Sequence, residues 1–104
     1  AAESGCDEWG VPAEGGDFNT LLEEGDTDVP IILMAGRFDP VTPPKGSKRV
    51  ADALGRDLLL FPNAGHGAVG SSDCARGIWL AFLDDPSQQP DTSCMDDLGP
   101  PDFA

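Results

Sequence analysis

Residues 29–62, "VPIILMAGRFDPVTPPKGSKRVADALGRDLLLFP", decide the fold class of this chain. Their first part, residues 29–36, is a continuous apolar run without alternation, which is typical of a parallel strand covered on both faces. Thr42 is followed by Pro43 and Pro44, and a polar cap with proline in the first turn predicts the start of a helix.

The rest of this stretch completes a strand–helix–strand unit. Apolar residues recur at helical spacing at Val50, Ala51 and Leu54, and Gly55 is expected to end the helix. A second apolar run, residues 58–62, predicts another buried strand. Two parallel strands require a crossover between them, and the intervening helix has a suitable length.

Three further segments follow the second strand. Residues 63–73 form a Gly-rich loop, and residues 74–85 carry a helical apolar stripe that we expect to pack on the same sheet: Ile78, Trp79, Phe82 and Leu83. The tail, residues 84–104, has too many prolines and too little apolar period for regular structure. The predicted class is α/β, with a βαβα order.

This sheet is predicted to be incomplete. Two parallel strands that are apolar on both faces cannot bury those faces with two helices alone, so the chain is expected to be the end of a larger α/β domain. Self-association or an unusual compact form is the alternative. We divide the chain into an acidic connecting segment (1–28), part of an α/β core (29–83) and the tail (84–104).

Composition excludes several classes of partner. The chain of 104 residues has 19 acidic and 6 basic residues, and its net charge of −13 disfavours binding to nucleic acid or to anionic membranes. No apolar stretch reaches the ~20 residues of a membrane helix. The N-terminus does not resemble a signal peptide, so we expect a soluble chain whose export signal, if any, was removed or lies outside it.

The three cysteines, Cys6, Cys74 and Cys94, do not have the spacing of a zinc site. Cys74 opens an apolar segment and Cys94 lies in the tail behind it, so we predict a disulfide between them that ties the tail to the body. Such a bond indicates an oxidising compartment. Three reduced thiols in a cytosolic protein are the alternative, and the partner of Cys6 is left open.

Two residues are candidates for chemistry. Asp39 follows the first predicted strand and His66, the only histidine, follows the second. Functional groups gather at the carboxyl ends of parallel strands, which lie under about 5 Å apart, so the two side chains are expected to meet. A carboxylate that fixes one imidazole nitrogen as a donor makes the other a directed base. The alternatives are an Asp-Pro turn and a plain loop histidine.

A nucleophile is not evident. The chain contains no G-x-S-x-G, and Ser71 and Ser72 lack the strand-to-sharp-turn setting that exposes a nucleophile. In α/β hydrolases the chain order is nucleophile, acid, histidine, so a C-terminal piece keeps the last two and loses the first.

Four blocks, "PIILMAGRFDPVTPP", "LLLFPNAGHGAV", "CARGIWLAFLDDP" and "DTSC", resemble the C-terminal region of secreted tripeptidyl aminopeptidase-like (TAP-like) α/β hydrolases, which are related to proline iminopeptidases. The resemblance covers about residues 28–104. It implies that Asp39 is the triad acid, that His66 is the triad base, and that Cys74 and Cys94 are disulfide-bonded.

The resemblance also implies parts that this sequence lacks, namely a serine nucleophile, an oxyanion hole and a helical cap domain. It implies a secreted or cell-envelope serine peptidase, namely an aminopeptidase acting on free N-termini, with ester cleavage also seen in relatives. The expected partners are the N-terminal part of the hydrolase and a peptide or ester substrate. We expect neither a cofactor nor a metal ion, and the chain alone is expected to be inactive.

The alternative function is a free-standing acidic, disulfide-stapled binding module without catalysis. It would act by contact with a basic partner or with calcium through tail carboxylates, namely Asp84, Asp85, Asp91, Asp96 and Asp97. Such tail acids are usually only solvated.

Overall fold

The computed structural model describes residues 8–10 and 27–101, and its centre is a sheet of two parallel strands. The elements follow in the order β1 (Leu33–Gly36), α3 (Pro44–Leu54), β2 (Leu58–Phe61), the 3-10 helix η1 (Ala68–Gly70), α4 (Asp73–Asp84) and the 3-10 helix η2 (Ser93–Asp97). Parallel strands with helices agree with the predicted α/β class. Cys6 and most of the segment 1–28 lie outside the described residues.

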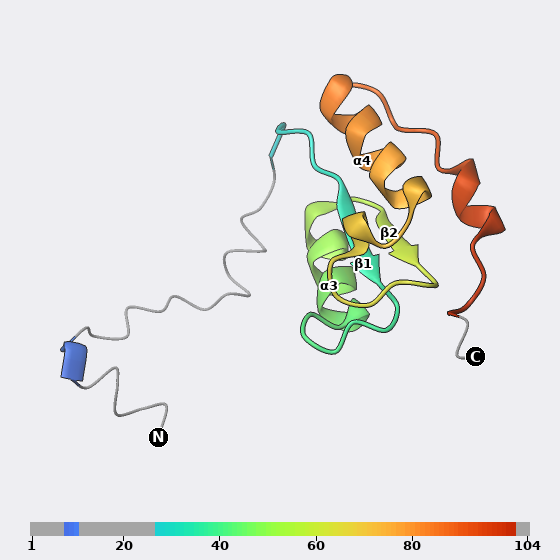
Figure 1. The fold of residues 1–104 in the computed structure, drawn as a ribbon. Coiled ribbons are helices and arrows are strands. Elements are labelled where there is room, and N and C mark those ends of the chain that lie inside the picture. The colour runs from blue at the N-terminus through green and yellow to red at the C-terminus, as the bar shows by residue number, and fades with distance from the viewer. Residues whose placement is uncertain (1–7, 11–26, 102–104) are drawn as a thin grey trace.

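The strand register places two sets of side chains on opposite faces of the sheet. Met34 pairs with Leu59 and Gly36 with Phe61, and side chains alternate between faces along each strand. Met34, Leu59 and Phe61 belong to the core cluster that includes Ala75 and Ile78 of α4. The other face meets α3, so the two strands lie between α3 and α4 (Figure 1).

The first strand is shorter than predicted. The apolar run begins at Val29, but β1 begins at Leu33 and pairs along its whole length with the four residues of β2. Val29 is exposed, and Pro30 has no backbone N–H to donate to a ladder. The predicted strand 29–36 is therefore too long at its amino end, because residues 29–32 are apolar but do not pair with β2.

Helix α3 ends where the sequence predicts and begins one residue later than expected. Gly55 adopts the left-handed conformation, with φ 62°, and its N–H bonds to Ala51 and Asp52 carbonyls. The N-cap is Pro43, whose side chain cannot cap, and Pro44 occupies the first turn. The expectation that Thr42 caps this helix is wrong, because its hydroxyl is bonded elsewhere.

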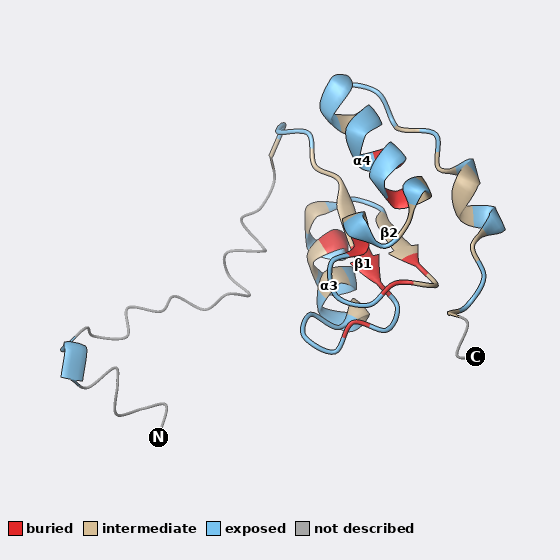
Figure 2. Ribbon diagram, in the orientation of Figure 1, coloured by how far each residue is buried: buried red, intermediate tan, exposed pale blue. Residues whose placement is uncertain are grey.

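Helix α4 buries only part of its predicted apolar stripe. Ile78 is buried and Phe82 is half-buried, but Trp79 and Leu83 are 38% and 54% exposed. Successive helix positions are about 100° apart, so the last two point away from the narrow sheet. Most of the helix beyond its first turns is exposed in Figure 2. Within residues 8–10 and 27–101, no helix has the length and apolar character needed to cross a membrane.

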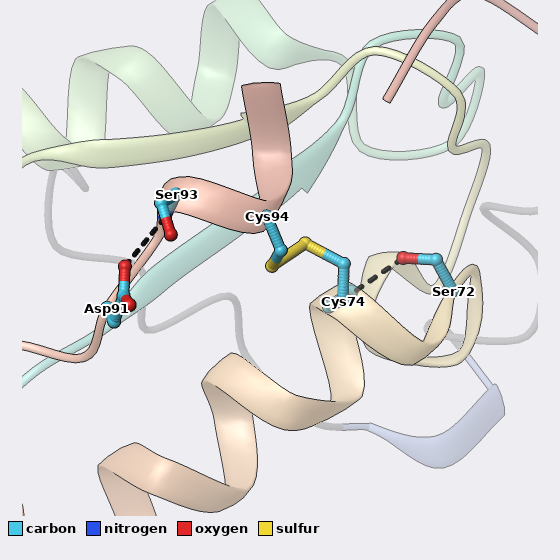
Figure 3. Close-up of a disulfide and its surroundings, with 6 residues drawn as sticks. Ser72, Cys74, Asp91, Ser93 and Cys94 are labelled. Atoms are coloured by element: carbon cyan, nitrogen blue, oxygen red, sulfur yellow. Dashed lines mark hydrogen bonds between the residues drawn. A yellow bond between two sulfur atoms is a disulfide. The ribbon is translucent and has the colours of Figure 1, made fainter. Parts of the chain in front are cut away.

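A disulfide joins α4 to the tail (Figure 3). Cys74 and Cys94 are bonded, with their Cα atoms 5.7 Å apart. The tail is not wholly irregular, because η2 forms there, and its Met95, with Leu98 just beyond, packs on the core. Asp91 starts this turn by accepting the backbone N–H of Ser93 at 2.9 Å. The sequence pattern does not predict η2, which carries Cys94 of the cross-link.

Candidate functional site

Asp39 and His66 meet at the carboxyl edge of the sheet. Asp39 lies three residues beyond β1 and His66 lies five residues beyond β2. His66 Nδ1 is 3.0 Å from Asp39 Oδ2 and 3.1 Å from Oδ1. Both distances are within hydrogen-bond reach, and a carboxylate can only accept, so Nδ1 is the nitrogen that carries the proton.

The carboxylate of Asp39 is buried and bonded on both oxygens. Only 7% of the residue is exposed. Its Oδ1 accepts the backbone N–H groups of Val41 at 2.8 Å and Thr42 at 2.9 Å, and its Oδ2 accepts the Thr42 hydroxyl at 2.6 Å. The Thr42 hydroxyl bond, with the two backbone bonds and the His66 contact, holds the pKa of Asp39 well below its ordinary value despite the opposing effect of burial. Asp39 therefore stays ionised and acts as an acceptor.

His66, in contrast, is open to solvent, with 59% of its side chain exposed. Because Nδ1 faces Asp39, Nε2 on the opposite side of the ring is the nitrogen that a substrate or a second catalytic group can reach. Gly67 adopts a left-handed φ of 82° directly after the histidine. Gly65 does not, so only one of the two flanking glycines supplies the conformational freedom that the sequence suggests.

Gly36 allows the two loops to approach each other. A Cβ atom at this position would lie 2.7 Å from the carbonyl oxygen of Ala64 and closer still to that of Gly65. The backbone N–H of Phe38 bonds to the Ala64 carbonyl at 3.0 Å, and that of Arg37 bonds to the Phe61 carbonyl at 3.0 Å. The loop that carries His66 is thus packed on the end of β1, next to Asp39.

Thr42 and Gly36 are the functional residues that sequence reasoning missed. Asp39 and Thr42 are three positions apart, and an aspartate often accepts N–H groups two and three residues further along in a turn. A glycine at the end of a strand often marks a close approach of another backbone. Both signals are present in "AGRFDPVT".

The other polar candidates have local structural duties. The Ser71 hydroxyl donates to the Ala68 carbonyl at 2.6 Å. Ser72 is the N-cap of α4, where its Oγ accepts the N–H of Ala75 at 3.1 Å. Cys74 and Cys94 are consumed by the disulfide. Neither serine has the setting of a nucleophile, in line with the sequence pattern.

Metal ligands do not gather in the part of the chain that the structure describes. No group of three His, Cys, Asp or Glu side chains there is arranged to hold an ion. Asp91 accepts a hydrogen bond from the backbone N–H of Ser93, and this bond is the main cause that lowers the pKa of the Asp91 carboxyl. The tail carboxylates therefore give no support to a calcium site.

A groove of about 470 Å³ lies at the opposite end of the strands from Asp39 and His66. Its walls include Ile32, which precedes β1, Asp57, which precedes β2, and Phe82 of α4. The residues of the tail close it on one side. Because it faces the amino ends of the strands, it is separate from the acid–histidine pair.

Comparison with known protein families gives a match. A family model described as "TAP-like protein" matches residues 1–94, which include both strands, the acid–histidine pair and both cysteines of the disulfide. Neither a search of curated proteins nor one of solved structures found a match.

Proposed function

Because this chain belongs to the TAP-like family of α/β hydrolases, we propose that Asp39 and His66 are the acid and base of a Ser–His–Asp triad whose serine lies outside the chain. The observation that carries this proposal is the contact between a buried, ionised carboxylate and an exposed imidazole at the carboxyl edge of two neighbouring parallel strands. This edge is where the functional groups of α/β sheets gather.

The geometry suits general acid–base catalysis. With Nδ1 protonated toward Asp39, His66 Nε2 removes the proton of the serine hydroxyl as its oxygen attacks the substrate carbonyl. The imidazolium then gives that proton to the leaving amine or alcohol, and a water molecule repeats the sequence to release the acid product. Asp39 stabilises the imidazolium and fixes its tautomer without taking the proton.

The small number of buried apolar side chains supports the view that this sheet belongs to a larger core, and the serine would lie in the rest of that core. The buried apolar residues of the described segments are Phe61, Ile78 and five alanines, namely Ala35, Ala51, Ala64, Ala68 and Ala75. Most residues of β1 and β2 are only half-buried although the strands are apolar. We infer that residues 29–83 form the C-terminal part of a larger hydrolase core, with 1–28 as the connection and 84–104 as a tethered tail.

The proposed substrates are peptides with a free amino terminus, which makes the complete protein an aminopeptidase, and esters form a second class. The proposed location is extracytoplasmic, because structural disulfides such as Cys74–Cys94 persist in oxidising compartments. The proposed partner is the part of the hydrolase that carries the serine.

The proposal is tested by expressing this chain together with the upstream part of its hydrolase and measuring cleavage of chromogenic peptides and esters. His66→Ala and Asp39→Asn are each expected to lower kcat by about 10³–10⁴-fold, the order seen when a triad member is lost. Asp52→Asn, which removes an exposed carboxylate on α3, is the control and should retain activity. Full activity of His66→Ala would refute the proposal.

A further inference from the structure

Thr42 is the side chain that completes the hydrogen bonding of Asp39. The two backbone N–H donors, from Val41 and Thr42, both bond to Oδ1, and they would do so with almost any side chain at these positions. Among residues 8–10 and 27–101, the one donor to Oδ2 apart from His66 is the Thr42 hydroxyl, at 2.6 Å. One oxygen is thus held by the main chain and the other by a single hydroxyl.

This difference matters because the last torsion of an aspartate side chain is soft. Rotation about the Cβ–Cγ bond is broad and roughly two-fold, so a carboxylate held at one oxygen can still turn its plane. His66 Nδ1 lies at nearly equal distances from both oxygens, 3.0 Å and 3.1 Å, so it faces the edge of the carboxylate between them. That arrangement requires a fixed carboxylate plane, and the bond from Thr42 to Oδ2 supplies the second fixed point.

We propose that Thr42 is a positioning residue of the acid–histidine pair: its hydroxyl sets the plane of the Asp39 carboxylate and thereby the direction in which His66 presents Nε2. This inference rests on the proposed function, because it assigns to Thr42 a part in the same reaction. The hydroxyl bond is also the strongest influence that lowers the pKa of Asp39, which keeps the carboxylate charged beside the imidazole.

Thr42 is exposed, so its substitution should leave the fold intact while changing the pair. Thr42→Val removes the hydroxyl with little change of shape, Thr42→Ala does so without placing a methyl group against Oδ2, and Thr42→Ser keeps the hydroxyl. The matched control is Thr92→Val, because Thr92 lies by the groove at the other end of the strands and its side chain caps no helix.

The experiment measures kcat and KM of these variants in the complete hydrolase, beside His66→Ala. Thr42→Val and Thr42→Ala are expected to lower kcat about tenfold, the order for one lost bond to a charged group, with KM within about twofold of wild type. Thr42→Ser and Thr92→Val should behave as wild type. A loss caused only by misfolding would reduce the amount of titratable active enzyme, and it would leave both KM and the kcat per titrated active site unchanged.

A second readout does not depend on catalysis. In the 104-residue chain, the carboxyl carbon of Asp39 is followed by NMR as pH falls, and it should titrate at higher pH in Thr42→Val and Thr42→Ala than in wild type or Thr42→Ser. An unchanged Asp39 titration, or an unchanged kcat in Thr42→Ala while His66→Ala is inactive, would overturn the inference and leave the proposed function standing. Activity in His66→Ala would overturn both.

Discussion

Gly36 is the residue on which the approach of the two functional loops depends. The carbonyl oxygens of Ala64 and Gly65 occupy the space that any larger side chain would need. These oxygens belong to backbone, which moves only if the whole His66 loop moves. The absence of one methyl group at Gly36 thus permits the contact between residues 27 positions apart.

Gly36→Ala is therefore expected to separate Asp39 from His66 and to destabilise the chain. Overpacking of this kind costs about 1–3 kcal/mol. The control is Gly46→Ala in α3, where a new Cβ meets nothing within 4 Å and where replacing glycine in a helix stabilises by about 0.5–1 kcal/mol. Urea unfolding of both variants measures the two effects, and equal stability of the two would contradict the expected clash.

Asp39 also makes stability depend on pH. The folded state lowers its pKa below the ordinary value of 3.8, so the unfolded state binds more protons in acid. The stabilisation is fully present above that value and is lost as pH falls below it. Asp39→Asn lacks this contribution, so the difference in unfolding free energy between wild type and variant should shrink from pH 5 toward pH 2, to be measured by denaturant titration at each pH. A constant difference would contradict the low pKa.

At the scale of elements, both the disulfide and apolar contacts join the tail to the rest of the structure. Residue Cys94 sits in η2, which is only five residues long, and the bond to Cys74 holds this turn against α4. Met95 and Leu98 then reach the core from a segment that is rich in proline. The cross-linked tail thus adds two apolar side chains to the core cluster although its overall apolar content is low.

Removal of the disulfide is expected to destabilise the chain by about 3 kcal/mol, since it closes a loop with a sequence separation of 20 residues. The double variant Cys74→Ala/Cys94→Ala and the reduced, alkylated wild type should lose similar amounts in urea unfolding. The oxidised wild type is the reference. A double variant as stable as the oxidised chain would show that η2 docks without the bond.

The sequence predicts the elements better than it predicts their boundaries and faces. The helix end at Gly55 and the presence of two strands are predicted correctly, because each follows from local chemistry, but the amino end of the first strand is not. The role of Thr42 is not predicted. A hydroxyl before two prolines can cap a helix or donate to a nearby carboxylate, and which of these occurs depends on where Asp39 lies. The exposure of Trp79 was missed because a helical stripe does not reveal how wide the sheet beneath it is.

For the site, the meeting of Asp39 and His66 follows from the order of the elements, since residues after adjacent parallel strands share one edge. Their catalytic role stays a prediction. The bond from Thr42 and the fit at Gly36 depend on loop conformations, and patterns of residue type do not specify these.

At the scale of the whole molecule, repulsion among acidic side chains acts against the stability that a small apolar core provides. The chain has a net charge of −13. Among the described residues, Phe61 is the one large side chain that is fully buried. Mutual repulsion of like charges favours expanded states, and salt screens it. The chain is thus expected to depend on ionic strength for its stability.

Raising NaCl from about 10 mM, where the Debye length is about 30 Å, to about 150 mM, where it is about 8 Å, should raise Tm at pH 7. For a domain of this size, each 1 kcal/mol gained appears as roughly 4–8 °C. The control is the same salt series near pH 4.1, where the net charge vanishes and the gain should disappear. A fall in Tm with salt at pH 7 would contradict the expected repulsion.

The loop that carries Asp39, residues 39–42, could be transferred to another protein as a unit. Among the described residues, the carboxylate of Asp39 accepts its hydrogen bonds from Val41 and Thr42, apart from the contact with His66. The charged half of the pair therefore carries its own scaffold in the four residues 39–42. Grafting that tetrapeptide behind another strand should transplant a pre-oriented carboxylate, whereas the imidazole would have to be supplied by the host's neighbouring loop.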